Sequence, residues 1–526
     1  MRVREAPAQG GLVEPRDRPG AAGGTDPLDH DVAPVLVEGP PGGGASGDRR
    51  RHGGAHEETG HLRCGGDHGL TLPGRRRVPL APAARLWTTG AVDHGLDAVV
   101  VGAGLAGLAC ALRLAEAGAG VLVLESGDGP GGRVRTDDAG GFRVDRGFQL
   151  VNPAYPALRR VLGEGGLAEL ALQPFGAGAA VASGRHHHLL GDPRRLPAAA
   201  LPSLLAPLGS PREKAAFLAW ALRAATADPR SVRDGADEPL ASALDRAGVR
   251  GKLRTGVVDP FLAGVLGDDE GRTSASFARL VVRSFVLGTP GVPPDGVQRL
   301  PDLLAGRLAA LPGTELRLGT AVEEVRAGAG GVRVRTADGE LTARTVVVAT
   351  DPWAAQDLLP GLEVPAPRGL TTFWHEAPEQ PARGSRARLL HLDGDRRGPV
   401  VNSAVMTAVA PGYGPTGRHL VASTVLGAGP GDGPGLEPVV LRQLEHLWGQ
   451  GTADWELVAT SAVPHALPAL LPPLRARQDP ALGDGVFLAG DHRDTASQQG
   501  ALTSGRRAAG AVLNALGLRP PAPAAA

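Results

Sequence analysis

The sequence is poor in lysine, isoleucine, tyrosine and cysteine. Only two of its 55 basic residues are lysines, Lys214 and Lys252, and its 526 residues include no isoleucine and two tyrosines. Lysine, isoleucine and tyrosine have AT-rich codons, so their scarcity indicates a GC-rich genome. Arginine-rich patches therefore carry less weight here as evidence of a binding site. The two cysteines, Cys64 and Cys110, exclude a disulfide framework, and Cys110 is expected to be a small buried residue.

A net charge and long apolar runs are also lacking. The formal net charge is zero, so no global field favours nucleic acid as a partner. A run of about 20 uncharged apolar residues is absent, so we expect no membrane-spanning helix. The 42 % hydrophobic content is enough for a sizeable core. These features predict a cytoplasmic protein and leave peripheral membrane contact open.

The beginning of the chain does not read as a domain. Residues 1–95 contain no phenylalanine, no tyrosine and one tryptophan, Trp87. Such a segment buries too little apolar surface to offset the entropy lost on ordering. We therefore predict a disordered extension over residues 1–91. A mis-assigned start is a further hypothesis, with translation beginning at Val92. Residues 518–526 are predicted to be a tail.

The most informative segment reads as strand, glycine turn, helix and strand. Two apolar runs, Ala98–Val101 and Val121–Leu124, flank an Ala- and Leu-rich helical stretch. Between the first run and the helix lies a Gly-x-Gly-x-x-Gly sequence formed by Gly102, Gly104 and Gly107. In such a turn the first glycine permits the tight bend, the second lets the backbone approach a pyrophosphate, and the third lets helix and strand pack closely.

An acidic residue completes this pattern. Glu125 ends the second apolar run, about 20 residues past the glycines, where a carboxylate accepts hydrogen bonds from a ribose diol. The start of the helix offers N–H groups and a partial positive charge to phosphates. The segment therefore predicts a dinucleotide site. The alternative is an ordinary buried βαβ unit in a glycine-rich chain.

The rest of the chain alternates between helical and strand-like patterns. Residues 172–191 read as a hairpin and residues 201–290 as a helical insert, including a helix over Lys214–Thr226 with Phe217, Leu218 and Leu222 on one face. The run Thr345–Ala349 is apolar enough for a buried parallel strand. A last strand over residues 485–489 precedes a helix over Ser497–Leu516.

Three separated motifs together resemble the flavin amine oxidase superfamily. They are GAGLAG with Glu125, GGRV at 131–134, and AGD followed by GALTSGRRAA within 489–509. The resemblance covers residues 96–517 and implies FAD as cofactor. It also implies an α/β fold, in which a Rossmann-like FAD-binding domain is assembled from separated segments and a mixed-sheet substrate domain carries a helical cap. The implied FAD-binding domain consists of residues 96–152, 295–352 and 480–517, and the implied substrate and cap domain consists of residues 153–294 and 353–479.

The resemblance assigns roles toward FAD to individual residues. The residues implied at the pyrophosphate turn are Gly102, Gly104, Leu105, Ala106 and Gly107. Glu125 is implied at the adenosine ribose, and Val322 at the adenine. Gly132 and Arg133 are implied along the phosphates and ribityl chain. Asp491 is implied at a ribityl hydroxyl or the diphosphate. A helix beginning near Gly500 and Ala501 is implied to point at the flavin.

The departures from the amine oxidases select a branch of this superfamily. Those oxidases carry a lysine near the flavin and an aromatic pair around the amine, whereas this chain has Gln498 and Gln499 before its terminal Gly-Ala. The sequence is therefore more similar to the phytoene-desaturase and protoporphyrinogen-oxidase branch. We expect hydride transfer from a largely apolar small molecule to FAD, with O2 or a quinone as acceptor. The alternatives are a non-redox polyene isomerase and a flavin-binding protein without turnover.

No general base stands out. His465, which follows a predicted strand of the substrate domain, is a candidate catalytic residue, and a hydrogen-bonded structural histidine is the alternative. No metal site is predicted.

Overall fold

A computed structural model describes residues 70–71, 95–428 and 434–519. Most of the predicted extension over residues 1–91, the hypothesis of a start at Val92, and the end of the predicted tail lie outside the described residues. The exception is β1 (Leu70–Thr71), which pairs antiparallel with the edge strand β18 (Glu456–Pro468), Leu70 opposite Ser461.

A parallel-rich sheet is assembled from three separated stretches of the chain. Its parallel strands within the described residues lie in the order β10 (Thr314–Arg317), β3 (Val121–Leu124), β2 (Leu96–Val101), β13 (Gly339–Val348) and β20 (Val486–Leu488). The first half of β13 continues into an antiparallel meander with β12 (Gly331–Thr336) and β11 (Val322–Gly328). The short strand β19 (Ala481–Gly483) pairs with β20.

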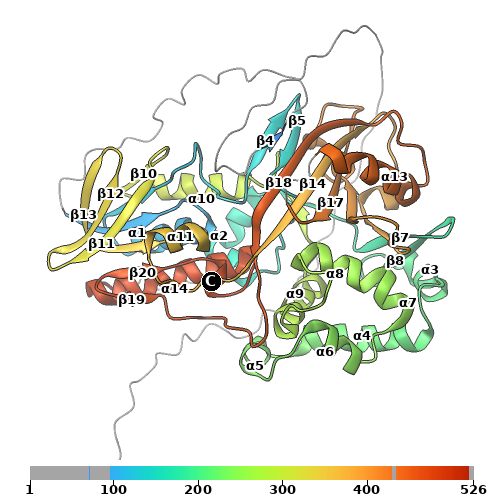
Figure 1. The fold of residues 1–526 in the computed structure, drawn as a ribbon, viewed down its shortest axis with the longest axis horizontal. Helices are drawn as coiled ribbons and strands as arrows, with labels where there is room; N and C mark the ends of the chain where they lie inside the picture. The colour runs from blue at the N-terminus through green and yellow to red at the C-terminus, as the bar shows by residue number, and fades with distance from the viewer. Residues whose placement is uncertain (1–69, 72–94, 429–433, 520–526) are drawn as a thin grey trace, which may run out of the picture. The chain divides into compact units, whose positions relative to one another are not determined.

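Both faces of this sheet are covered, which explains its continuous apolar strands. On β2, Ala98 and Val100 belong to the core shared with α1 (Leu105–Glu116), α10 (Arg299–Ala309) and α14 (Gln498–Leu516). The alternate residues Val99 and Val101 belong to the core beneath the meander. Figure 1 shows α1 and α14 close together beside the parallel-rich sheet.

The helix α1 contains Cys110. As predicted, the thiol is buried, and this burial raises its pKa to about 12 although the charge of Arg113 acts in the opposite direction.

A second, mixed sheet follows the order β1, β18, β14, β17, β16, β15, β7, β8. The strands not yet bounded are β14 (Pro367–Ala377), β17 (His419–Leu426), β16 (Val400–Val405), β15 (Leu390–Asp393), β7 (Gly178–Ser183) and β8 (His186–Gly191). Neighbours pair antiparallel except β15 and β7. Helix α13 (Glu437–Trp448) packs on one face of this sheet. The predicted hairpin is formed by β7 and β8, with its turn at Gly184 and Arg185. It begins at Gly178 rather than at residue 172, because the residues before it form β6 (Gln173–Pro174), which pairs with β9 (Gly291–Val292).

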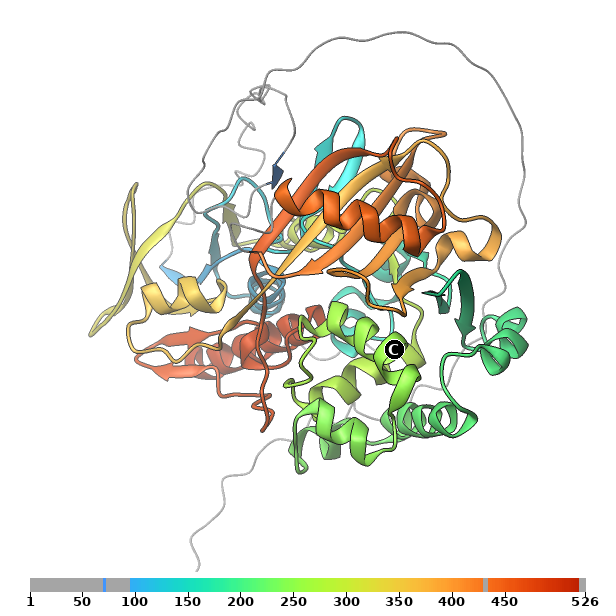
Figure 2. The same ribbon diagram turned by 45° about the vertical axis from the view of Figure 1, so that its right-hand side comes forward.

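The helical insert forms a layer beside the mixed sheet (Figures 1 and 2). Its α-helices are α3 (Ala200–Leu205), α4 (Pro211–Thr226), α5 (Pro229–Asp234), α6 (Leu240–Arg246), α7 (Gly251–Leu253), α8 (Asp259–Leu266) and α9 (Ala275–Leu287). One turn of π-helix, Arg254–Val258, joins α7 to α8.

The helix α4 buries a different face from the one that carries its leucines. Trp220, Ala221 and Ala224 are buried, whereas Leu218 and Leu222 are exposed. The three residues Phe217, Leu218 and Leu222 therefore do not form one buried face. Packing of α4 against α9 selects the tryptophan side, because that side offers a large apolar ring and small residues that allow close approach.

The remaining elements connect these layers. They are β4 (Thr136–Ala139), β5 (Phe142–Asp145), α2 (Pro156–Glu169), β6 (Gln173–Pro174), β9 (Gly291–Val292), α11 (Pro352–Leu358) and α12 (Met406–Val409). The predicted fold class, an α/β protein with a parallel-rich sheet from separated segments and a mixed sheet, is confirmed. No helix within the described residues is long and apolar enough to cross a membrane.

Candidate functional site

The glycine turn between β2 and α1 leaves open space in front of one glycine. Gly102 has a φ of +100°, which favours glycine, and its N–H donates to the carbonyl of Leu124 at 2.7 Å. A Cβ at Gly107 would lie 1.9 Å from the carbonyl oxygen of Gly102, whereas a Cβ at Gly104 would meet no atom within 4 Å. The first-turn N–H groups of α1, including those of Leu105 and Ala106, have no acceptor within the helix. The turn thus combines free space with backbone donors.

Glu125 lies at the end of β3, next to this turn. Its carboxylate accepts hydrogen bonds from the N–H of Ala103 at 2.7 Å and from that of Gly127 at 2.8 Å. The N–H of Thr320 donates to the carbonyl of Glu125 at 2.8 Å. This contact brings the start of β11, and with it Val322, to the same edge of the sheet.

The segment that carries Gly132 and Arg133 is tied to the glycine turn. The N–H of Gly131 donates to the carbonyl of Ala103 at 2.9 Å, and Gly131 forms a parallel bridge with Gly104. Gly132 has a φ of +59°, and a Cβ there would lie 3.5 Å from the Cα of Gly104. The positive φ favours glycine, whereas the space beside Gly104 would admit a Cβ in ordinary van der Waals contact.

Arg133 joins this segment to two distant parts of the chain. Its guanidinium donates to Asp491 Oδ1 and to the carbonyl of Ala466, both at 2.8 Å. Burial lowers the pKa of Arg133, but the charge of Asp491, its hydrogen bond and the charge of Asp351 outweigh that effect and raise the pKa overall. Arg133 therefore stays charged, and much of its charge is matched by Asp491.

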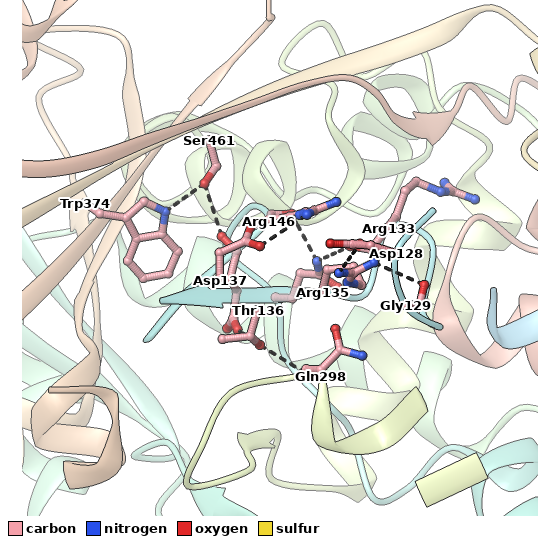
Figure 3. A network of polar contacts seen from close by, with 12 residues as sticks. Asp128, Gly129, Arg133, Arg135, Thr136, Asp137, Arg146, Gln298, Trp374 and Ser461 are labelled. Carbon is pink, nitrogen blue, oxygen red and sulfur yellow. Dashed lines mark hydrogen bonds and ion pairs between the residues drawn. The ribbon is translucent and has the colours of Figure 1, made fainter. Parts of the chain in front are cut away.

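A polar network holds this segment in place (Figure 3). Gln149 Nε2 donates to the carbonyl of Arg133 at 2.7 Å. Arg146 forms two hydrogen bonds with Asp137, at 2.9 and 3.1 Å. Beneath them Asp145 is fully buried, and its carboxylate accepts from Thr136 Oγ1 at 2.6 Å and from Tyr413 Oη at 2.7 Å. Because burial dominates over these hydrogen bonds, the pKa of Asp145 is raised to about 6.

The C-terminal segment brings Asp491 and the start of α14 to the same place. Asp491 lies three residues after the end of β20 and is buried. Ser497 caps α14 by accepting from the N–H of Gly500 at 3.1 Å, and the N–H of Ala501 donates to the carbonyl of Ser497. The helix thus begins at Gln498, two residues before the Gly500–Ala501 start expected from the resemblance.

Gly500 and Gly505 set how closely α14 packs. A Cβ at Gly500 would lie 1.9 Å from the carbonyl oxygen of Thr495, and one at Gly505 would lie 2.0 Å from that of Ala106. The second contact is a close crossing between α14 and the first turn of α1. It brings the start of α14 toward the glycine turn.

Sequence reasoning missed one residue here, His492. Its side chain is 5 % exposed, and within the described residues neither ring nitrogen has a hydrogen-bond partner. Burial lowers its pKa to about 4, against the opposing charge of Asp491, so the ring is neutral near pH 7. A buried polar group without a partner is costly. The motif pattern gave no signal for His492, because its importance comes from burial beside Asp491.

His465 lies at the margin of this group of residues. It stands on β18, and its ring stacks on that of Trp353 with centroids 4.2 Å apart. The next residue, Ala466, supplies the carbonyl that Arg133 contacts. Stacking fixes the plane of the imidazole, and its catalytic role stays a prediction.

The two lysines lie elsewhere. Lys214 is on α4, where Nζ donates to the carbonyls of Ser203, Leu204 and Ala206 at 3.0, 2.7 and 2.6 Å. Lys252 is on α7. Both belong to the helical insert, and neither is on a strand of the mixed sheet.

The assembled residues fit a dinucleotide cofactor. The glycine turn has free space at Gly104 and backbone donors at the start of α1, with the Glu125 carboxylate and the Arg133–Asp491 ion pair nearby. Within the described residues His492, next to Asp491, has two ring nitrogens without a hydrogen-bond partner. The family model for flavin-containing amine oxidoreductases matches residues 105–513, which is more than half of the chain. The chain belongs to this family. Its members bind FAD, and the protein is an FAD-dependent oxidoreductase of the flavin-containing amine oxidoreductase family.

Curated relatives of this flavin-containing amine oxidoreductase match over parts of their length. A phytoene dehydrogenase from Streptomyces griseus is 59 % identical over 58 residues, which cover 11 % of each chain. A coproporphyrinogen III oxidase from Propionibacterium freudenreichii is 32 % identical over 184 residues, covering 32 % of this chain and 31 % of the relative.

A solved structure extends the likeness in fold. The putative protoporphyrinogen oxidase from Exiguobacterium sp. 255-15 superposes with a TM-score of 0.60 at 18 % identity, over 79 % of this chain and 98 % of that one. At that identity the likeness supports the fold and carries no statement about substrate.

Proposed function

We propose that this oxidoreductase transfers a hydride from a largely apolar organic small molecule to FAD, in a desaturation or oxidation, and that O2 or a quinone takes up the electrons. The position of the lysines carries this proposal. An amine oxidase of this family is expected to hold a lysine near the flavin, but Lys214 and Lys252 both belong to the helical insert, and Lys214 is engaged by three backbone carbonyls.

Among the relatives, the phytoene dehydrogenase supports this substrate class, whereas two polyamine oxidases that also match do not. The phytoene dehydrogenase is named for a polyene hydrocarbon, and its identity to this chain is high over the short matched stretch. Gln499 further argues against an amine cage at the start of α14, because its Oε1 accepts from the N–H of Ala157 and its side chain is thereby committed to packing against α2.

The proposed domains follow from the sheets. Residues 96–152, 295–352 and 480–517 would form the FAD-binding domain, since the strands of the parallel-rich sheet come from these segments. Residues 153–294 and 353–479 would form the substrate and cap domain. The proposed FAD-contacting residues are Gly102, Gly104, Leu105, Ala106, Gly107, Glu125, Gly132, Arg133, Val322, Asp491, Gly500 and Ala501, with His492 as an addition.

When bound, FAD supplies the two-electron acceptor. The residues of the chain hold the cofactor in place and stabilise its charges. The backbone donors at the start of α1 bind phosphate oxygens, and the Glu125 carboxylate accepts from a ribose hydroxyl. The positive end of the α14 dipole stabilises negative charge on a group that faces it. The Arg133–Asp491 pair joins the Gly132–Arg133 segment to the segment that follows β20, and it adds little net charge.

The test is anaerobic reduction of the purified holoprotein. The protein is mixed with phytoene in detergent micelles, with coproporphyrinogen III, or with a primary amine, and the visible absorbance of the flavin is followed. We expect bleaching by phytoene or another apolar polyene and none by the amine. Bleaching by the amine alone would contradict an apolar substrate.

Two further outcomes test the alternatives. If the oxidised flavin is not bleached but the pre-reduced holoprotein converts one polyene isomer to another, the protein is an isomerase and the proposal fails. If neither reaction occurs with any of these substrates, the protein binds flavin without turnover and the proposed hydride transfer is wrong. A colourless folded preparation that cannot be reconstituted with FAD would refute the cofactor site itself.

A further inference from the structure

Two neighbouring helices of the insert expose a group of leucines. Leu201, Leu204 and Leu205 on α3 are 63, 65 and 69 % exposed, and Leu218 and Leu222 on α4 are 59 and 46 % exposed. These five side chains, here named the leucine patch, make up most of the large exposed apolar side chains among the described residues. Exposed apolar side chains that gather on neighbouring elements of a soluble protein indicate an interaction site.

The helix α3 buries no side chain, although it is firmly attached. None of its residues is buried. Ser203 Oγ accepts from the N–H of Gly191 at 3.0 Å, which ties α3 to the end of β8. Lys214 Nζ, on the first turns of α4, donates to the carbonyls of Ser203, Leu204 and Ala206 at the end of α3. These contacts fix the backbone of α3 while its leucines face outward.

The position of α3 supports an outward-facing role. Figure 1 places α3 at the outer end of β8, with α4 following it along the edge of the insert. Figure 2 shows the same relation after rotation: α3 stands out from the other helices. The exposed side of α4 carries Ala215, Leu218 and Leu222, spaced by three and four residues. Both helices therefore expose leucines, and Lys214 of α4 ties the two helices together at the end of α3.

The surroundings of the patch are basic in a chain whose net charge is zero. Residues 192–226 contain five basic and two acidic residues, a net charge of plus three. Asp192 and Arg194 pair with each other, Glu213 accepts from the N–H of Ser210, and Lys214 donates to backbone carbonyls at the end of α3. The arginines of α4 therefore supply the basic rim. Arg212 and Arg223 are exposed beside the leucines of α4. Apolar side chains with a basic rim are complementary to an anionic bilayer surface.

We propose that the leucine patch docks on the surface of an anionic lipid bilayer, with α3 and the exposed side of α4 in the interfacial layer and the rest of the protein outside it. A second copy of the chain fits less well, because a symmetric contact through this patch would bring two basic rims together. The inference goes beyond the proposed reaction. Its test needs no turnover, so the two proposals can fail separately.

The test is flotation of the full-length holoprotein with vesicles. Vesicles of phosphatidylcholine with phosphatidylglycerol are compared with vesicles of phosphatidylcholine alone. We expect binding to the mixed vesicles, weaker binding to the neutral ones, and a decrease with added salt. The double variant Leu204→Ser/Leu205→Ser is expected to lose at least about tenfold in the partition coefficient, because two apolar side chains no longer enter the interface.

Two control variants make the test specific. Leu471→Ser/Leu482→Ser changes two leucines that are 54 and 43 % exposed and lie outside the patch, and it should bind vesicles as the wild type does. Arg212→Gln/Arg223→Gln should reduce the preference for mixed vesicles and leave binding to neutral vesicles unchanged. Flavin absorbance and circular dichroism verify that each variant is folded.

Three results would overturn the inference. The first is that the wild-type holoprotein stays with the soluble fraction in both vesicle preparations. The second is equal binding by Leu204→Ser/Leu205→Ser and the control variant. The third is a concentration-dependent dimer, seen by light scattering, that the Leu204→Ser/Leu205→Ser variant abolishes while no vesicle binding is detected. That result would assign the patch to a second copy of the chain.

Discussion

The open space in front of Gly104 gives a direct test of the cofactor site. Gly104 has a φ of −69° and a ψ of 175°, a conformation open to every residue type, and a Cβ there would meet no atom within 4 Å. Alanine at this position therefore fits the apoprotein. Alanine restricts the unfolded chain, but Gly104 is also the N-cap of α1, where alanine is less favourable than glycine. Because these two effects oppose each other, Gly104→Ala should change the stability of the apoprotein by less than about 1 kcal/mol.

The same methyl group should weaken FAD binding. It would occupy the space before the first-turn N–H groups of α1, where the proposal puts the pyrophosphate. Losing one charge-assisted hydrogen bond costs about 1.5–3 kcal/mol, which is about a 10- to 150-fold loss of affinity. FAD affinity should thus fall while the stability of the apoprotein changes little.

Gly107→Ala is the matched comparison. It adds the same methyl group three residues later, but there the Cβ would lie 1.9 Å from the carbonyl oxygen of Gly102. A backbone atom in a tight turn cannot move away at low cost, so we expect the apoprotein to lose about 1–3 kcal/mol or more. FAD affinity should fall only as a consequence of the distorted turn.

The assay combines two measurements on the apoprotein prepared by removing the flavin. Thermal unfolding gives its stability, and quenching of flavin fluorescence during titration gives the dissociation constant of FAD. If Gly104→Ala binds FAD as tightly as the wild type, the pyrophosphate does not lie at this turn and the proposed site is wrong.

Three other substitutions have defined outcomes. His492→Leu should raise the stability of the apoprotein by about 1–3 kcal/mol, since it removes a buried ring without partners, and should weaken FAD binding about tenfold. If both the stability of the apoprotein and its affinity for FAD fall, His492 has a purely structural role. Because the pKa of Asp145 is raised to about 6, its charged carboxyl lowers the free energy of unfolding by about 3 kcal/mol above pH 6, and this cost disappears as the pH falls toward 4. Asp145→Asn should remove this pH dependence from the free energy of unfolding measured in urea between about pH 4 and pH 6. A variant with the same pH profile as the wild type would contradict the prediction. Tyr413→Phe removes the hydrogen bond to Asp145 at 2.7 Å and should cost about 1.5–3 kcal/mol in urea unfolding at pH 7; a cost near zero would mean that the bond contributes little.

Local sequence patterns determined the elements around the cofactor site. The run Thr345–Ala349 predicts a buried parallel strand, and in the structure Val347 belongs to the core on one face of the sheet and Val346 to the core on the other. The spacing of Gly102, Gly104 and Gly107 reflects steric demands of one tight turn, which do not depend on the rest of the fold. The ends of the predicted strands were less certain: β13 extends back to Gly339, because its first half pairs with β12 rather than with β2.

Tertiary structure alone decided which distant residues meet. The sequence predicts that Arg133 and Asp491 both approach FAD, but their 2.8 Å ion pair depends on how segments 358 residues apart pack. The same packing buries His492 without a partner. It also turns Leu218 and Leu222 outward, because the Trp220 side of α4 packs against α9 and a helix can bury only one face in this layer. Periodicity in the sequence marks the apolar residues of a helix, whereas the neighbour that the helix meets decides which of them enter the core.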